Sequence, residues 1–133
     1  MPREAIDTPL FDPIGPYSHA VRAGHLVFVS GTPGIDPASG ELAGTTAHEQ
    51  AGQAFDNVIR LVEDAGGSAA DIVAVQVHLV DTADFAEMNR AFARRFKAPY
   101  PARTVFGVAA LPKRGALLTV SATACLASDK GAP

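Results

Sequence analysis

Hydrophobic and small polar residues alternate along the segment from Leu117 to Leu126. Since successive side chains of a strand point to opposite faces, this alternation predicts a strand with one apolar and one mostly polar face. The segment 72–80 is rich in β-branched residues and alternates in the same way, with Val73, Val75, Val77 and Leu79 expected on the buried face. Shorter β-rich runs predict further strands over 17–21, 25–30 and 103–108.

Two segments have helical periodicity instead. Thr46 and Glu49 have the spacing of a capping box, and apolar residues then recur on one helical face until Gly66-Gly67. A second helix is expected to begin at Asp81 or Thr82 and to end before Pro99, since proline interrupts a helix. Its buried stripe is predicted to be formed by Phe85, Met88, Phe92 and Phe96.

The resulting order, ββαβαββ, predicts a single two-layer α+β domain over residues 1–133, with a mixed sheet and both helices on one face. Residues from about 127 to 133 are expected to form a flexible tail. The other sheet face is neither fully polar nor fully apolar, and a monomer would solvate it whereas an oligomer would cover it with another copy. Its expected residues are Gln76, His78, Thr119, Ser121 and Thr123.

Composition excludes several functional classes. The 133 residues include 14 acidic and 11 basic ones, for a net charge of −3, which argues against electrostatic binding to nucleic acid or to an anionic membrane. The single cysteine excludes an internal disulfide, and no histidine spacing predicts a metal site. We find neither a membrane-spanning run nor a signal peptide, and therefore expect a cytoplasmic protein.

The second predicted helix carries a basic outer face. It comprises Arg90, Arg94, Arg95 and Lys97. A nucleic-acid patch is one interpretation of such a cluster, and an ordinary solvated helix face is the favoured one. Basic residues near the end of a helix also complement its dipole.

Two polar residues stand out in apolar surroundings. Arg103 lies in the otherwise apolar strand 102–106, where its guanidinium must reach water or find an anion such as a carboxylate. An internal salt bridge is the equally weighted alternative. Asn89 lies on the apolar stripe of the second helix, where a structural hydrogen bond to the backbone is favoured over a ligand contact.

Weaker candidates come from the N-terminal half. Tyr17 follows a Gly-Pro turn that would orient it, although most tyrosines in such places are ordinary surface or core residues. Ser30 and Gly31 end a strand, where backbone amides are free to meet a ligand. His19 and His78 are possible bases or ligands.

These residues belong to a set of short motifs that occur in a specific order. The motifs are Ile14-Gly15-Pro16-Tyr17-Ser18, Val29-Ser30-Gly31, Asp36-Pro37-Ala38-Ser39-Gly40-Glu41, Val80-Asp81 through Phe85 and Asn89, Pro101-Ala102-Arg103 and Leu111-Pro112-Lys113. In them, over almost its whole length, the chain resembles the reactive-intermediate deaminase family, RidA/YjgF.

The resemblance implies a chorismate-mutase-like fold and a homotrimer with its sites at subunit interfaces. It implies hydrolysis of reactive imines or enamines derived from amino acids, such as 2-aminoacrylate to pyruvate and ammonia, without a cofactor. Arg103 would bind the carboxylate of the substrate or of a keto acid. Tyr17, Ser30, Asn89 and backbone groups at Val105 would complete the site.

One position departs from the family pattern. Ser121 stands where the family has a glutamate credited with placing the attacking water, and a neutral hydroxyl is a poor base. His19, which replaces a glutamine of many relatives, could partly compensate. The sequence therefore leaves three functions open: an imine deaminase, a non-catalytic binder of small carboxylates and, least favoured by charge, a ribonuclease or translation inhibitor.

Overall fold

The computed structural model describes residues 2–127. The predicted tail, apart from Ala127, lies outside this range. The strands are β1 (Glu4–Ala5), β2 (Ala20–Ala23), β3 (Leu26–Pro33), β4 (Ile72–Leu79), β5 (Ala102–Gly107) and β6 (Leu118–Cys125). The helices are α1 (Ala47–Asp64) and α2 (Phe85–Ala93), with short 3-10 turns at Ala69–Asp71 and Thr82–Asp84.

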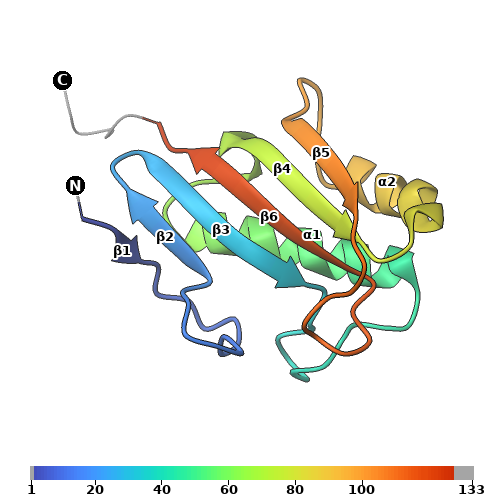
Figure 1. Ribbon diagram of the computed structural model, residues 1–133. Coiled ribbons are helices and arrows are strands. Elements are labelled where there is room, and N and C mark those ends of the chain that lie inside the picture. The colour runs from blue at the N-terminus through green and yellow to red at the C-terminus, as the bar shows by residue number, and fades with distance from the viewer. Residues whose placement is uncertain (1, 128–133) are drawn as a thin grey trace.

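The six strands form one sheet in the order β1-β2-β3-β6-β4-β5. Neighbouring strands are antiparallel except β4 and β5, which are parallel and are connected through α2. Both helices pack on the same side of the sheet, α1 crossing behind its centre and α2 lying behind β5 (Figure 1). The predicted α+β fold with a mixed sheet is confirmed.

Helix α1 begins where the sequence predicts. The Thr46 hydroxyl accepts a hydrogen bond from the Glu49 amide at 3.2 Å, and the Glu49 carboxylate accepts one from the Thr46 amide at 3.2 Å. This reciprocal pair satisfies amides that the first helical turn leaves free. The periodic apolar residues of α1 are fully buried, and Phe55 packs edge-on against Phe92 and Phe96 near α2.

The structure differs from the predicted elements in three details. The two-residue strand β1 has no periodicity to predict it, and β2 begins at Ala20, so Tyr17 lies in the preceding loop. Val73 is 48% exposed rather than buried, because the pairing of β4 with β6 shifts between Ile72 and Ala74 and turns Ile72 inward instead. Phe85 is 43% exposed, since it opens α2 directly after a 3-10 turn at the edge of the core.

Strand β3 contains a bulge in its pairing with β6. Val29 pairs with Ala122 and Thr32 pairs with Val120, so β3 has one residue more than β6 over this interval. Ser30 and Gly31 together therefore lie opposite Ser121. Such bulges bend the strand and redirect side chains.

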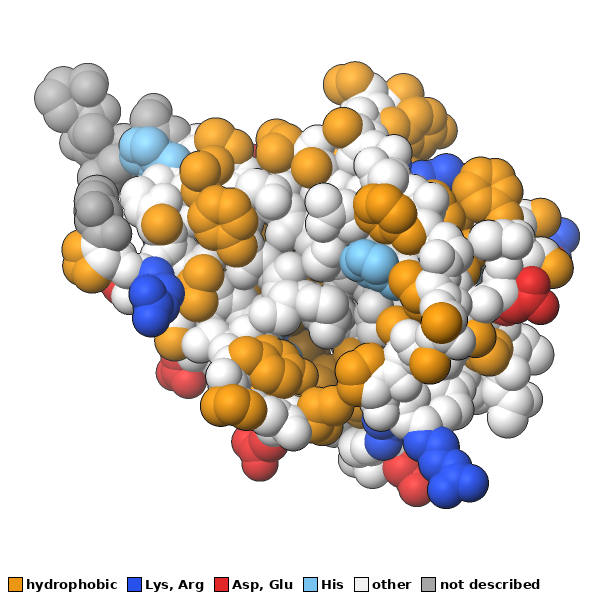
Figure 2. All heavy atoms as spheres, viewed as in Figure 1, with side chains coloured by type: hydrophobic (Ala, Val, Ile, Leu, Met, Phe, Trp, Pro, Cys, Tyr) orange, Lys and Arg blue, Asp and Glu red, His pale blue; other side chains and the backbone are white. Residues whose placement is uncertain are grey.

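The sheet face opposite the helices has no covering layer among the described residues. Large hydrophobic side chains on this face are half exposed, namely Leu26, Phe28 and Phe106. Figure 2 shows that hydrophobic side chains on this face form separate patches among polar and small ones, above a hollow that is ringed by hydrophobic groups. Neither helix of the described range has the length and apolarity needed to cross a membrane.

Candidate functional site

A cleft opens on the uncovered sheet face beside the β3 bulge. It has a volume of about 560 Å³, and Tyr17, Ser30 and Gly31, all predicted as site residues, line it together with Thr119. Its position corresponds to the hollow in Figure 2. The loop before β2 brings Tyr17 to this place, while the bulge brings the backbone of Ser30 and Gly31.

The remaining walls are mainly apolar. Phe11 and Ile14 come from the N-terminal loop, Ile35 follows β3, and Pro112 precedes β6. Lys113 is the single charged residue among the lining residues. Phe11 and Ile35 were not predicted, because only the distribution of isolated hydrophobic residues in loops would have indicated them. The cleft is suited to a small ligand with an apolar part and an anionic group.

Ser30 is held in place by hydrogen bonds to its neighbours. Its hydroxyl donates to the Ser18 carbonyl at 2.7 Å, and its amide donates to the His19 carbonyl at 2.9 Å. The Ser30 carbonyl in turn accepts from the Thr32 hydroxyl at 2.7 Å. Since its proton is engaged, the Ser30 hydroxyl faces the cleft as an acceptor.

His19, which was expected to contact the ligand, lies behind the cleft wall instead of in the cleft. The side chain is buried, its Nε2 contacts the Phe11 carbonyl, and its ring packs edge-on against Phe11, with centroids 4.8 Å apart, and Tyr17, at 6.1 Å. His19 does not line the cleft. It supports the two aromatic residues that do.

Ser121 lies opposite the bulge, on the same open face. Its hydroxyl donates to Gln76 Oε1 at 2.9 Å, across the pairing of β6 with β4. Ser121 is therefore joined to a neutral partner. His78, the other histidine candidate, stacks on Phe106 with ring centroids 5.4 Å apart.

Arg103 lies on the helix side of the sheet. It pairs in register with the buried Val75, and its guanidinium lies 4.7 Å from the centroid of the Phe92 ring and 5.7 Å from that of Phe85. Its one hydrogen-bond contact within residues 2–127 is to the Met88 sulfur, at 3.8 Å. Partial burial lowers the pKa of this guanidinium, because desolvation disfavours its charge.

The internal salt bridge considered as an alternative for Arg103 is therefore not found among the described residues. Aromatic rings position the group through cation–π contacts while leaving its planar fork free for a carboxylate. Val105 lies two residues further along β5, and Asn89 follows Met88 in α2. The half-buried Asn89 side chain makes no hydrogen bond within the described range.

The structure thus brings the predicted residues into two groups. The cleft group, comprising Tyr17, Ser30, Gly31 and the nearby Ser121, lies at the loop before β2, at β3 and at β6. The edge group, comprising Arg103, Asn89 and Val105, lies at β5 and α2. Strands β3 and β5 are separated by two others, which corresponds to about 14 Å across the sheet. Since the two groups also lie on opposite faces, one chain does not bring them together.

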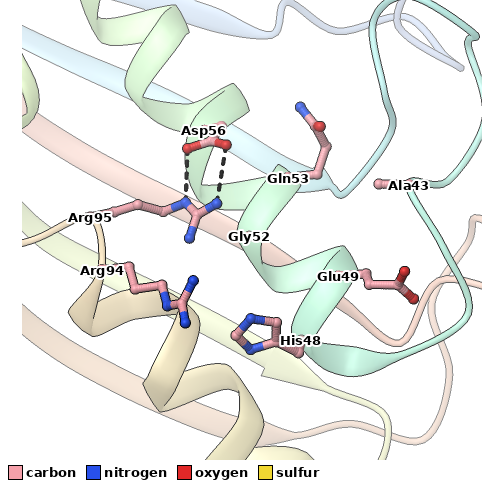
Figure 3. A pocket seen from close by; sticks show the side chains of 8 residues that line it. All are labelled: Ala43, His48, Glu49, Gly52, Gln53, Asp56, Arg94 and Arg95. Carbon is pink, nitrogen blue, oxygen red and sulfur yellow. Dashed lines mark hydrogen bonds and ion pairs between the residues drawn. The ribbon is translucent and has the colours of Figure 1, made fainter.

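A second hollow lies between the helices and contains none of the predicted site residues (Figure 3). Arg95 crosses it to Asp56 of α1 and donates two hydrogen bonds, at 2.8 and 3.2 Å. Gly52 leaves room for this side chain, since a Cβ there would lie 2.8 Å from Arg95 Nη2. Arg90 is likewise paired, with Glu87, so two of the basic residues on this helix face are engaged with acids.

Within residues 2–127, no three side chains of histidine, cysteine, aspartate or glutamate lie close enough together to hold a metal ion. The fold and the cleft define a small α+β protein with a largely apolar site that contains one lysine and with a separate guanidinium that has no acidic partner among residues 2–127.

The sequence model of the family described as Endoribonuclease L-PSP matches residues 8–126. A protein of Dermatophagoides farinae named 2-iminobutanoate/2-iminopropanoate deaminase is 39% identical over 113 residues, which is 84% of this chain and 88% of that protein. The crystal structure of RidA from an Antarctic Psychrobacter matches with a TM-score of 0.87 at 38% identity, over 92% of this chain and 99% of that chain.

The crystal structure of E. coli TdcF with bound serine matches equally well, with a TM-score of 0.87 at 34% identity, over 93% of this chain and 99% of that chain. The chain therefore belongs to the RidA/YjgF family. Relatives in this family carry names of imine deaminases.

Proposed function

We propose that the protein hydrolyses reactive imines and enamines derived from amino acids, such as 2-aminoacrylate and its imine tautomer. The observation that carries the proposal is the free guanidinium of Arg103, held by two aromatic rings with no acidic partner in the described chain. A planar guanidinium in this state matches a carboxylate with two parallel hydrogen bonds. The deaminase names of the relatives and the serine bound to the TdcF neighbour support an amino-acid-like ligand.

We propose further that the complete site forms between copies of the chain in a homotrimer. The edge group of one copy would face the cleft group of the next, which would bring Arg103 to the apolar cleft. The separation of the groups within one chain and the half-exposed hydrophobic residues of the uncovered face support this arrangement. A covered face would also bring Gln76 and Ser121 into a drier environment.

Hydrolysis of an imine needs few catalytic groups from the protein. The enamine first takes a proton at carbon to give 2-iminopropanoate. Water then adds to the C=N carbon, and the resulting carbinolamine loses ammonia to leave pyruvate. Arg103 would fix the carboxylate, and the Ser121 hydroxyl and Tyr17 would hold the water and the departing nitrogen. Proximity and orientation would supply most of the acceleration, because the protonated imine is already electrophilic.

The test is release of ammonia and pyruvate from freshly generated 2-aminoacrylate, compared with the spontaneous rate. The wild-type protein should accelerate the release, and Arg103→Ala should abolish most of the acceleration while retaining the fold by circular dichroism. If wild type gives no acceleration with either this imine or 2-iminobutanoate, the protein is not a deaminase of small imines.

A non-catalytic role in binding small carboxylates is the second candidate, and the neutral Ser121–Gln76 pair favours it. A binder needs the guanidinium and the cleft but no base. Calorimetry with 2-oxobutanoate separates the two functions, since a binder would take up the keto acid without accelerating imine hydrolysis.

A further inference from the structure

Helix α1 packs on the sheet face opposite the cleft and carries two buried amide side chains that reach segments flanking the cleft. Gln50 and Asn57 are each only 1% exposed. They are seven residues apart, so they lie on the same side of the helix, two turns apart. Buried amides are retained where their hydrogen bonds are satisfied. The side-chain hydrogen bonds of these two lead to the end of β3, to loops and to one residue of α1.

Asn57 holds the cleft wall that follows β3. Its Nδ2 donates to the Pro33 carbonyl at 3.2 Å and to the Ile35 carbonyl at 2.8 Å, and both of these residues line the cleft. Its Oδ1 accepts from Gln53 Nε2 at 2.8 Å, which fixes the orientation of the amide. Both donor hydrogens of Asn57 are therefore used on one short segment.

Between these two carbonyls, the backbone lies directly against the helix. A Cβ at Gly34 would lie 2.2 Å from the Gln50 backbone carbonyl, so only glycine fits. The segment 33–35 is thus attached to α1 at three successive residues. Its position relative to the sheet depends on the helix as well as on β3.

Gln50 holds the opposite wall. Its Nε2 donates to the carbonyls of Gly44 and Gly115, at 3.0 and 3.1 Å, and its Oε1 accepts from the Leu117 amide at 2.8 Å. Gly115 and Leu117 form the base of the loop that carries Pro112 and Lys113 into the cleft. One helix therefore anchors both walls from behind.

We propose that Gln50 and Asn57 are positioning residues that set the width of the cleft and thereby its affinity for ligand, without contacting the ligand. This inference rests on the proposed function in one respect, namely that the cleft receives the apolar part of the substrate. An amide is suited to this task because it donates two hydrogen bonds without a charge at any ordinary pH.

The sharpest test is Asn57→Asp, which keeps the shape of the side chain. An ionised carboxylate has no hydrogen to donate and would face two carbonyl oxygens, whereas the protonated acid donates once. Burial raises the pKa of such a carboxyl, so protonation should occur within an accessible range. For 2-oxobutanoate, the ratio of the dissociation constant of Asn57→Asp to that of wild type should be about ten at pH 8 and should fall toward one at pH 5.

Two further variants act as controls. Asn57→Leu removes the donors at every pH, so its weakening of binding should be independent of pH relative to wild type. Leu61→Ala, at a fully buried site one turn further along α1, should lower thermal stability while leaving the dissociation constant unchanged. If Asn57→Asp does not fold, Gln50→Glu offers the same test on the other wall.

A second readout is independent of ligand. The Ala43 amide donates to the Gly34 carbonyl at 2.9 Å, and its hydrogen exchange reports on the 33–35 wall. Exchange at Ala43 should accelerate in Asn57→Asp beyond its acceleration in Leu61→Ala. If hydrogen exchange at Ala43 accelerates in Asn57→Asp but the wild-type protein binds no 2-oxobutanoate, the positioning role is supported and the proposed function is rejected. Equal exchange and a ratio of dissociation constants that does not depend on pH would overturn the inference.

Discussion

The Ser121 hydroxyl donates to Gln76 Oε1 at 2.9 Å, between residues that face each other across β6 and β4. A serine hydroxyl has one proton, and this one is used within the chain. Toward the bulge, Ser121 therefore offers lone pairs that can accept a hydrogen bond from a water molecule, but it offers no group that can take the proton of that water at neutral pH.

Introducing an acid at this position should raise the rate of imine hydrolysis. We expect Ser121→Glu to accelerate release of ammonia from 2-aminoacrylate by about tenfold or more, since a positioned base typically contributes ~10²–10⁴-fold. Its affinity for a keto acid should be similar or slightly lower, because a negative charge enters near the substrate carboxylate. Rates are compared at matched protein concentration for wild type, Ser121→Glu and Ser121→Ala.

A fast wild type that Ser121→Glu slows would contradict this prediction. The attacking water would then be held elsewhere, and the loop around His19 and Tyr17 would be the next place to examine.

Replacing Arg103 by lysine should weaken keto-acid binding about tenfold, because an ammonium does not reproduce two parallel hydrogen bonds to a carboxylate. The rings of Phe85 and Phe92 can still accommodate a cation, so the fold should be retained. Calorimetric titration with 2-oxobutanoate measures the change. An unaltered affinity would exclude Arg103 as the carboxylate ligand.

The uncovered sheet face should be covered in solution by two further copies. Size-exclusion chromatography with light scattering should give about three times the chain mass of 13.8 kDa. A charge introduced on this face by Phe28→Asp should dissociate the assembly and abolish hydrolysis together, since the site would lose the partner's Arg103. A wild-type monomer at micromolar concentration that still hydrolyses imines would rule out the shared site.

The capping box of α1 should contribute measurably to stability. Thr46→Ala removes the acceptor for the Glu49 amide, and loss of such a cap typically lowers the free energy of unfolding by about 0.5–2 kcal/mol. Thr46→Ser, which keeps the hydroxyl, is the matched control. Urea unfolding at pH 7 measures the difference.

The same cap has a defined pH dependence. Hydrogen bonds from Thr46 lower the pKa of Glu49 below its usual 4.5. A lowered carboxyl pKa stabilises the fold above the unfolded value and ceases to do so as pH falls through the folded value. The difference between wild type and Thr46→Ala should therefore narrow below about pH 4. A constant difference down to pH 3 would show that the Glu49 carboxylate adds nothing to the cap.

The sequence predicts α1 and β6 well because their signals are local. The capping box at Thr46 and the strict alternation before Leu126 each lie within one element. The exposure of Val73 could not be predicted in this way, since it follows from a shift in pairing with a strand about fifty residues later in the chain.

In the candidate site, too, some features follow from local sequence signals and others depend on how the strands pair. Tyr17, Ser30 and Arg103 were singled out by motif and environment, but their separation into two groups depends on the strand order, which no local pattern contains. Gln50 and Asn57 were not predicted as part of the site, because polar residues of an amphipathic helix are ordinarily expected on its solvent side. Their signal was available as polar side chains spaced seven residues apart within the buried face.

The extra residue in β3 has a consequence for how this site can vary. Gly31 has an ordinary backbone conformation, and an added Cβ would lie 3.7 Å from the Thr119 hydroxyl, so its replacement by alanine keeps the chain length and the bulge. Deletion of Gly31 would do the opposite. It would leave Val29 and Thr32 pointing inward and restore an unbroken ladder with β6, but it would remove the bend that the bulge introduces beside the cleft. At this point in the chain, the number of residues matters more than their identity.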